Sequence, residues 1–411
     1  MREINKMLIP ELLAPAGDLE KLRFAYIYGA DAAYIGGGEY SLRLNSGFDL
    51  PGIAEAVDLA HSMGKKLYVA VNSFLRNKDM DCLPQYLQEL SGIAPDALIL
   101  SDPGVFVLAK EYAPNIPLHI STQSNITNWR SAQMWHDLGA QRVILSRELS
   151  LDEAAEISER ADIETEIFIH GAMCISYSGR CLLSSFMTGR SANLGNCSHP
   201  CRYNYVLEEE KRPGEYFPIS EDEKGSYIMN SKDLCLIRQI PRLCGGGFSS
   251  LKIEGRNKSA YYVANCVRIY RAALDAYAAD PEHYCLDPLW GEELSKISHR
   301  GYTQAFAEGM TGWESQRYDD GGYIRGYDFT AIVRDICPGY LLLEQRNHIA
   351  AGDKLEIILP DGTFRSLRAE HIYDENGLPL KAANHPHQLV KVPFTNSGGM
   401  SPPLIVRRPV R

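Results

Sequence analysis

Short apolar runs alternate with helical patterns up to about residue 280 of this 411-residue chain. The runs are ELLAPAG (11–17), DAAYIGG (31–37), KKLYVAVN (65–72), DALILSD (96–102), PLHISTQ (117–123), QRVILSRE (141–148), TEIFIHG (165–171) and SLKIEGR (250–256). Each run holds about five apolar residues and ends in small or polar ones. This pattern favours strands buried on both faces of a parallel sheet over the alternation of a half-exposed sheet.

Helical patterns connect these runs. Examples are LEKLRFAYIYG, IAEAVDLAHSMG, CLPQYLQELSG and NWRSAQMWHDLG, each of which ends at a glycine, a helix stop signal. Strands that alternate with helices in this number predict an α/β fold, a (β/α)8 TIM-like barrel. A doubly wound sheet is the alternative, although such sheets usually have fewer strands. We expect the barrel to span residues 1–285 and a helix over residues 259–279 to close it.

The connection between the seventh and eighth runs, residues 172–249, is too long for a simple helical crossover. Long connections of this kind are usually functional or disordered. This one contains Cys174, Cys181, Cys197 and Cys201. We therefore interpret it as a Cys-rich functional insertion after strand 7.

The pattern changes near residue 328. Residues 286–327 are expected to be a connecting segment rich in aromatics and glycines. From 328 to 411 the β-type runs are FTAIVRDI, YLLLEQR, DKLEIILP, FRSLRAEHIYD, HQLVKVPF and PPLIVRR, separated by turns such as PDG and ENG. They predict a small all-β C-terminal domain, a β-barrel.

Polar side chains follow nearly every predicted barrel strand. The C-terminal ends of barrel strands line one mouth, where barrel enzymes place their active sites. Loops are polar in any case, so the density of this set is more informative than any single member. The set consists of Asp18, Asn72, Asp102, Gln123, Arg147, Glu148, His170, Glu254 and Arg256.

Charge and composition narrow the class of protein. The formal net charge of −10 argues against a surface coated in basic residues, but a local basic groove would still suffice for nucleic acid. Residues 328–411 hold ten Lys and Arg against nine Asp and Glu, a net +1, which leaves −11 on the rest. Since no apolar run reaches the ~18 residues of a membrane span and no secretory signal is evident, we expect a cytoplasmic protein without a membrane partner.

Cysteines cluster in the insertion, and in a reducing compartment such clusters indicate metal or redox chemistry rather than disulfides. The spacing is Cys174-x6-Cys181-x15-Cys197-x3-Cys201, and Cys235 follows after a further 33 residues. Four thiolates can hold zinc or an iron–sulfur cluster. Structural zinc usually shows two tight pairs, whereas only Cys197 and Cys201 are closely spaced here. The spacing therefore favours a cluster over zinc and leaves thiol redox chemistry and unrelated buried cysteines open.

Other chemistries have weaker signals. Neither the HExxH motif of zinc peptidases nor the GxSxG motif of serine hydrolases is present. A cysteine nucleophile could use His170 or His199 as its base. Lys232 and Asp233, together with the charges of SLKIEGR, could clamp a small carboxylate or a phosphate, or form a structural ion-pair network.

The segment EIFIHGAMCISYSGRCLLSSFMTGR resembles the signature of the collagenase-like peptidase family U32. ELLAPAGD, AAYIGG, SKDLC and SLKIEGR are similar to its other blocks and occur in the same order. The resemblance covers roughly residues 10 to 325. The C-terminal β domain is similar to the domain appended in longer members, which resembles a translation-factor barrel.

The resemblance implies more than the family name. Several members are oxygen-independent or prephenate-dependent hydroxylation proteins that act on RNA or ubiquinone and hold a 4Fe–4S cluster on four cysteines. Length and domain order resemble those of the members that form 5-hydroxyuridine at the wobble position of tRNA. The partners implied are tRNA and a small carboxylate such as prephenate.

The implied cluster ligands are Cys174, Cys181, Cys197 and Cys235, with Cys201 as the alternative to Cys197 and zinc as the alternative metal. The catalytic candidates are His170, Arg147, Glu148, Lys232, Asp233, Glu254 and Arg256. Two further hypotheses remain: a collagenase-like peptidase, and a non-catalytic RNA-binding scaffold.

Overall fold

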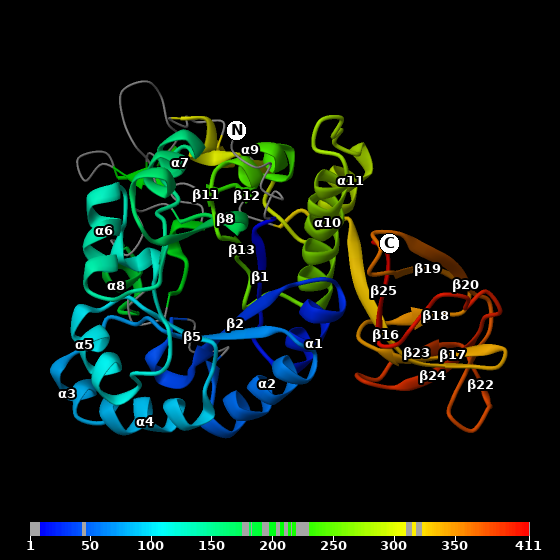
Figure 1. Ribbon diagram of the computed structural model, residues 1–411. Helices are drawn as coiled ribbons and strands as arrows, with labels where there is room; N and C mark the ends of the chain where they lie inside the picture. The colour runs from blue at the N-terminus through cyan, green and yellow to red at the C-terminus, as the bar shows by residue number, and fades with distance from the viewer. Residues whose placement is uncertain are drawn as a thin grey trace.

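A barrel surrounded by helices and a smaller β domain lie side by side in a computed structural model of the chain (Figure 1). The residues that it describes are 9–42, 47–174, 181, 183–190, 197–202, 206–208, 213–214, 216–218, 230–309, 315–317 and 323–410. Within these ranges, no helix is both long and apolar enough to cross a membrane.

Parallel strands close into a ring. Among the described residues the ring has eight strands: β1 (Glu11–Pro15), β2 (Ala32–Gly37), β4 (Lys66–Val71), β5 (Ala97–Leu100), β6 (Leu118–Ile120), β7 (Arg142–Ile144), β8 (Glu164–Ala172) and β13 (Ser250–Ile253). Neighbours pair in chain order, and β13 pairs with both β1 and β8 to complete the circle. Each predicted apolar run forms one of these strands, so the predicted (β/α)8 barrel is confirmed. A short strand, β3 (Gly47–Phe48), extends the sheet beside β2.

Helices follow the strands and surround the barrel. They are α1 (Leu19–Ile27), α2 (Leu50–Ser62), α3 (Asn77–Met80), α4 (Leu83–Ile93), α5 (Pro103–Tyr112), α6 (Trp129–Asp137), α7 (Leu151–Arg160), α9 (Ile240–Gly245) and α10 (Ala260–Ala279). Asp18 caps α1 by accepting a hydrogen bond from Lys21 N at 2.8 Å, and Asp102 caps α5 by accepting from Gly104 N at 2.7 Å. These two mouth candidates therefore serve as helix caps.

The insertion after β8 adds strands to the rim of the barrel. It contains α8 (Leu183–Thr188), β9 (Val206–Glu208), β10 (Tyr216–Pro218), β11 (Asn230–Ser231) and β12 (Asp233–Cys235), while residues 175–180 and 219–229 are among those outside the described ranges. β12 pairs antiparallel with the end of β8 and parallel with β14 (Tyr302–Thr303). The expected connecting segment 286–327 thus contributes a strand to the barrel sheet, together with α11 (Pro288–Ser295) and β15 (Gln316–Arg317), which pairs with β11.

The C-terminal domain is all-β, as predicted, and forms an antiparallel half-barrel. Its main sheet runs β20-β19-β25-β16-β17-β24-β21-β22. The strands of the domain are β16 (Tyr327–Cys337), β17 (Tyr340–Gln345), β18 (Ile349–Ala350), β19 (Asp353–Ile358), β20 (Phe364–Ala369), β21 (Ile372–Tyr373), β22 (Pro379–Leu380), β23 (Ala382–Ala383), β24 (Leu389–Pro393) and β25 (Leu404–Pro409). The run FRSLRAEHIYD is not one strand: its first part, β20, pairs with β19 at one edge, while β21 pairs with β24 and β22 near the other.

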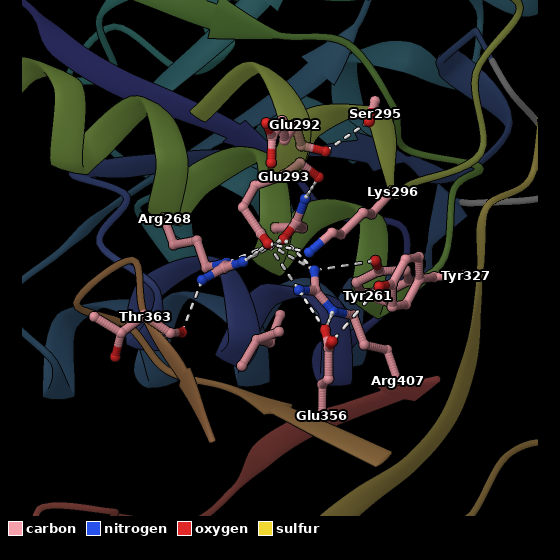
Figure 2. Close-up of polar contacts among 12 residues, drawn as sticks. Tyr261, Arg268, Glu292, Glu293, Ser295, Lys296, Tyr327, Glu356, Thr363 and Arg407 are labelled. Atoms are coloured by element: carbon pink, nitrogen blue, oxygen red, sulfur yellow. Dashed lines mark hydrogen bonds and ion pairs between the residues drawn. The ribbon is translucent and has the colours of Figure 1, made fainter. Parts of the chain in front are cut away.

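A buried charge network joins the two domains (Figure 2). The Glu293 carboxylate, on α11, accepts hydrogen bonds from both terminal guanidinium nitrogens of Arg407, on β25, at 2.7 and 2.9 Å. It is also paired with Arg268 of α10 and, at 2.6 Å, with Lys296. Arg407 continues to Glu356 of β19 at 2.7 Å. Because Arg268 and Arg407 are fully buried, the network fixes the β domain against α10 and α11.

We predict that Glu293→Gln destabilises the protein by about 3–5 kcal/mol, because it leaves two buried guanidinium groups without their shared carboxylate. Burial alone would raise the pKa of Glu293, but Arg407 and Arg268 lower it to about 2. The carboxylate therefore stabilises the fold above its ordinary pKa, and this contribution is lost as the pH falls towards 2.

Urea unfolding at several pH values measures this effect. The difference between wild type and Glu293→Gln should be full near pH 7 and should shrink from about pH 5 to about pH 2. Glu292→Gln is the matched control, since Glu292 is exposed on the same helix. An equal, small loss in both variants would contradict the proposed role of Glu293.

Candidate active site

Side-chain hydrogen bonds join the ends of β4, β5 and β6 at the barrel mouth. Asn72 donates from Nδ2 to Ser121 Oγ at 3.3 Å, and Ser101 donates from Oγ to the Asn72 carbonyl oxygen at 2.7 Å. All three residues are buried. Asn72 thus occupies the predicted position, and Gln123 lies in the helical turn that follows β6.

The SLKIEGR motif brings two charged side chains to the same mouth. The Tyr34 hydroxyl of β2 lies 3.1 Å from the Ile253 carbonyl oxygen and 3.4 Å from Glu254 Oε2. Arg256 is only 5% exposed, donates to the Leu42 carbonyl oxygen, and has its guanidinium carbon 5.7 Å from the Tyr34 ring centroid. Glu254 and Arg256 therefore both lie near Tyr34, on the chain that leaves β13.

Gly171 permits the close approach of β8 to this motif. Its φ of 113° lies in the left-handed region, and a Cβ there would clash with the Glu254 carbonyl oxygen. The Glu254 N–H donates to the His170 carbonyl oxygen at 2.8 Å. The glycine of IHGAM is thus required by the position of Glu254.

Below the mouth, the barrel interior is charged. Glu166 of β8 has no exposed surface and lies 2.9 Å from Lys252 Nζ and 3.2 Å from Arg142 Nη1. Arg142 also binds Glu11 at 2.8 Å. Burial alone would raise the pKa of Glu166, but the charges of Lys252 and Arg142 lower it, so the group is a carboxylate.

Aromatic rings pack beside these charges: Lys252 Nζ lies 4.2 Å from the Tyr34 ring centroid, and the Arg142 guanidinium carbon lies 5.6 Å from that of Tyr68. His119 packs edge-on against Tyr68, with centroids 4.9 Å apart, and burial together with Arg142 lowers its pKa to about 3. The reasoning from strand ends did not select Arg142, Glu166 or His119. A polar residue in the middle of a buried apolar run was the available signal, because in a barrel such a residue faces the interior.

Arg147 fastens the end of β8 to the mouth. Its Nη1 donates to the Ala172 carbonyl oxygen at 2.8 Å, and its guanidinium carbon lies 4.6 Å from the Phe168 ring centroid. Lys252 Nζ lies 5.5 Å from the same centroid. Phe168 therefore connects Arg147 to the SLKIEGR motif. Glu148, the next residue along the chain, is partly buried.

His170 lies away from the mouth. A register shift between Lys252 and Ile253 aligns His170 with Ile253 in the β8–β13 ladder. Its ring packs against Tyr270 and Tyr262 of α10, with centroids 5.6 and 5.9 Å away. It is 1% exposed, and burial lowers its pKa to about 3. The imidazole is therefore neutral and shielded from solvent.

Asp233 lies on β12 and is aligned with Ala172 of β8, the residue whose carbonyl oxygen Arg147 binds. Asp233 is 1% exposed and pairs with the buried Arg300 at 2.6 Å. Lys232 is partly buried beside Gly301. Asp233 is therefore held by a buried ion pair beside the end of β8.

Two of the segments that carry candidate ligand cysteines are linked by a hydrogen bond, and a third joins the barrel sheet beside β8. Ser198 N donates to Ser184 Oγ at 3.0 Å, which ties the chain after Cys197 to α8, the helix that follows Cys181. Cys235 lies on β12, with its sulfur 3.8 Å from the Tyr270 hydroxyl, and burial raises the pKa of its thiol.

The ligand set Cys174, Cys181, Cys197 and Cys235 stays a prediction. Cys235 pairs with His170 in the β8–β12 ladder, and the pairing ends at Ala172, two residues before Cys174. In the described part of the chain, no three His, Cys, Asp or Glu side chains are grouped to hold a metal ion. Thiols are nevertheless donors that suit an iron–sulfur cluster.

Comparison with known proteins finds matches to both parts of this chain. The model of peptidase family U32 matches residues 17–317, and that of the U32 C-terminal domain matches residues 325–407. The chain is 44% identical to tRNA hydroxylation protein P1 of Bacillus subtilis, over 93% of this chain and 91% of the relative. It is 38% identical to tRNA hydroxylation protein P of Escherichia coli, over 92% of each. A 23S rRNA 5-hydroxycytidine synthase of Escherichia coli is 34% identical over 85% of this chain and 52% of its own length.

We predict that Asp233→Asn destabilises the protein by about 3–5 kcal/mol because it leaves Arg300 buried without its carboxylate. The double variant Asp233→Leu with Arg300→Met should recover much of that loss, since it removes both charges together. Urea unfolding measures both changes. Asp152→Asn, which breaks an exposed pair with Arg242, is the control and should change stability by less than about 1 kcal/mol.

Activity of the double variant separates the two roles of Asp233. Recovery of activity with stability means that the carboxylate acts only through Arg300. A stable but inactive double variant would instead assign Asp233 to the chemistry.

Proposed function

The chain belongs to peptidase family U32, and we propose that it is an RNA-hydroxylating enzyme that forms 5-hydroxyuridine at the wobble position of tRNA. The observation that carries this proposal is similarity over both domains to proteins named for tRNA hydroxylation, with 93% of this chain covered in one case. A shared barrel alone would support only the fold. Similarity that includes the β domain supports a shared substrate, because the whole architecture is retained.

Geometry disfavours a cysteine peptidase built on His170. Such an enzyme needs a thiol of lowered pKa and a histidine that accepts its proton. The thiol nearest to His170 along the sheet is Cys235, and burial raises its pKa while burial of His170 lowers the imidazole pKa to about 3. Both shifts oppose the formation of a thiolate–imidazolium pair.

For the cofactor we propose a 4Fe–4S cluster on Cys174, Cys181, Cys197 and Cys235, with Cys201 as the alternative to Cys197. The support is the soft thiol donor set, the hydrogen bond that links the chain after Cys197 to α8, and the pairing of β12 with the end of β8. A bound cluster would supply one-electron redox chemistry. Deprotonation of Cys235, whose thiol pKa is raised, would accompany binding.

The mouth residues would bind and orient the reactants. We propose that Arg147 or Arg256 binds the carboxylate of a co-substrate such as prephenate, since guanidinium groups bind carboxylates with two parallel hydrogen bonds. Glu254, held by Tyr34, would orient the polar edge of the uracil ring. The β domain, which carries a small net positive charge against a strongly negative remainder, would help to dock tRNA.

Mass spectrometry of tRNA nucleosides tests the function. We predict that a strain lacking the gene loses 5-hydroxyuridine derivatives and that the restored gene returns them, because formation of the base depends on this chain. Unchanged nucleosides in the deletion strain would contradict the proposal. Cleavage of gelatin by the purified, metal-free protein would favour the peptidase instead.

Individual Cys→Ala variants test the ligand set. We predict that Cys174→Ala, Cys181→Ala, Cys197→Ala and Cys235→Ala each lose most bound iron after anaerobic purification, because four thiolates complete a 4Fe–4S site. Iron, sulfide and the absorbance near about 400 nm measure this. Cys337→Ala, in the β domain, is the control and should keep full iron.

Cys201→Ala decides between the two neighbouring candidates. Full iron in that variant supports Cys197, while loss of iron in Cys201→Ala with retention in Cys197→Ala exchanges them. A colourless, active protein that contains zinc would overturn the cluster proposal.

A further inference from the structure

A polar cavity of about 400 Å³ lies where the barrel meets the β domain. Its barrel side is the loop and first turn of α10, with residues 297–298, and its β-domain side is the start of β16 with Asn347. The volume falls within the range of small-molecule sites. The residues that line it are Asn257, Lys258, Ser259, Tyr261, Tyr262, Ile297, Ser298, Tyr323, Arg325, Tyr327, Asp328, Phe329 and Asn347.

Positive charge dominates this junction cavity. Lys258 and Arg325 both line it, and Arg325 is exposed. Asp328 is the single acidic residue among the described residues of the lining, and Arg408 lies 3.6 Å from its carboxylate. Two lining cations and one acid that is already paired make the cavity suited to an anion.

An exposed aromatic ring lies beside these cations. Tyr323 is 46% exposed and lines the cavity. The Lys258 ammonium lies 4.2 Å from its ring centroid, and the Arg300 guanidinium carbon lies 5.3 Å from it. Arg300 Nη1 is also 3.4 Å from the Tyr323 hydroxyl. The ring is therefore held in place while nearly half of the side chain stays open to solvent.

A side chain at the barrel mouth and one in the cavity lining lie two positions apart in the chain. Arg256 lies at the mouth and Lys258, two residues later, lines the cavity. The opposite wall belongs to the domain junction, because two of its tyrosines contact Arg407. The Tyr261 hydroxyl lies 3.4 Å from Arg407 Nη1, and the Tyr327 ring centroid lies 5.0 Å from the Arg407 guanidinium carbon. The network around Glu293 thus shapes this wall.

We propose that the junction cavity binds one unpaired nucleotide of the RNA substrate, outside the reacting base. Lys258 and Arg325 contact its phosphate, and its base stacks on Tyr323. An exposed aromatic ring next to cations is the combination with which proteins bind single-stranded nucleic acid. Duplex RNA does not fit as well, because its bases are stacked within the helix and do not reach an aromatic side chain. The inference rests on the proposed function and adds a second contact with the same substrate.

Binding of an unmodified tRNA transcript to the full-length protein tests this site. We expect Tyr323→Ala to weaken binding roughly fivefold or more, since stacking of one base is lost. Tyr323→Phe should bind within about twofold of wild type because the ring remains. Arg325→Glu should weaken binding by roughly tenfold and reduce the salt dependence by about one phosphate contact.

Lys381→Glu is the matched control for charge. Lys381 is an exposed lysine of the β domain that does not line the cavity. Thermal unfolding of each variant should match that of wild type, because Tyr323, Arg325 and Lys381 are all exposed.

The outcomes separate this inference from the proposed function. If Tyr323→Ala and Arg325→Glu bind tRNA as tightly as wild type and still restore 5-hydroxyuridine, the proposed role of the cavity is overturned and the proposed function is unaffected. Equal weakening by Lys381→Glu overturns it as well, since the effect is then one of overall charge. A wild-type protein that neither binds tRNA nor restores the nucleoside sinks the proposed function itself.

Discussion

One buried carboxylate sets the alignment of the strands on which the site depends. Glu166 lies on β8, between Arg142 of β7 and Lys252 of β13, and both cations bind it. Slippage of either neighbour would leave a charge unpaired inside the barrel, which costs several kcal/mol. The same register places Glu254 and Arg256, which follow Lys252, at the mouth. Burying these charges costs free energy, yet their pairing fixes the strand register that places Glu254 and Arg256 at the mouth.

The second constraint is the junction between the domains. Glu293 pairs with cations from α10 and β25. The Tyr28 hydroxyl, directly after α1, adds a neutral contact by donating to the Ile358 carbonyl oxygen at 2.9 Å. Relative motion of domains within one chain is the default, and these buried contacts oppose it. A β domain held at a constant distance from the mouth would let one RNA molecule contact both at once.

Local pattern predicted the elements better than it predicted the roles of side chains. The apolar runs located every barrel strand because burial on both faces demands continuous apolar residues. Asn72, Arg147, Glu254 and Arg256 also lie at the mouth as expected. Asp18 and Asp102 also follow strands, but they cap helices. In this barrel the short loop after a strand leads directly into a helix, so a carboxylate in that loop can occupy the N-cap position. The division of FRSLRAEHIYD into β20 and β21 depended on their different partner strands, which a local sequence pattern does not indicate.

By itself, the sequence determined the barrel, the all-β domain and the concentration of thiols after strand 7, because composition and periodicity are properties of neighbouring residues. The tertiary structure alone decided which way each side chain faces. A shift of one residue between β8 and β13 turned His170 from the mouth towards the tyrosines of α10, since side chains alternate between the two faces of a strand. The tertiary structure also paired Asp233 with Arg300, 67 residues away along the chain. Register and long-range pairing depend on the closure of the whole barrel, and a single run of sequence contains neither.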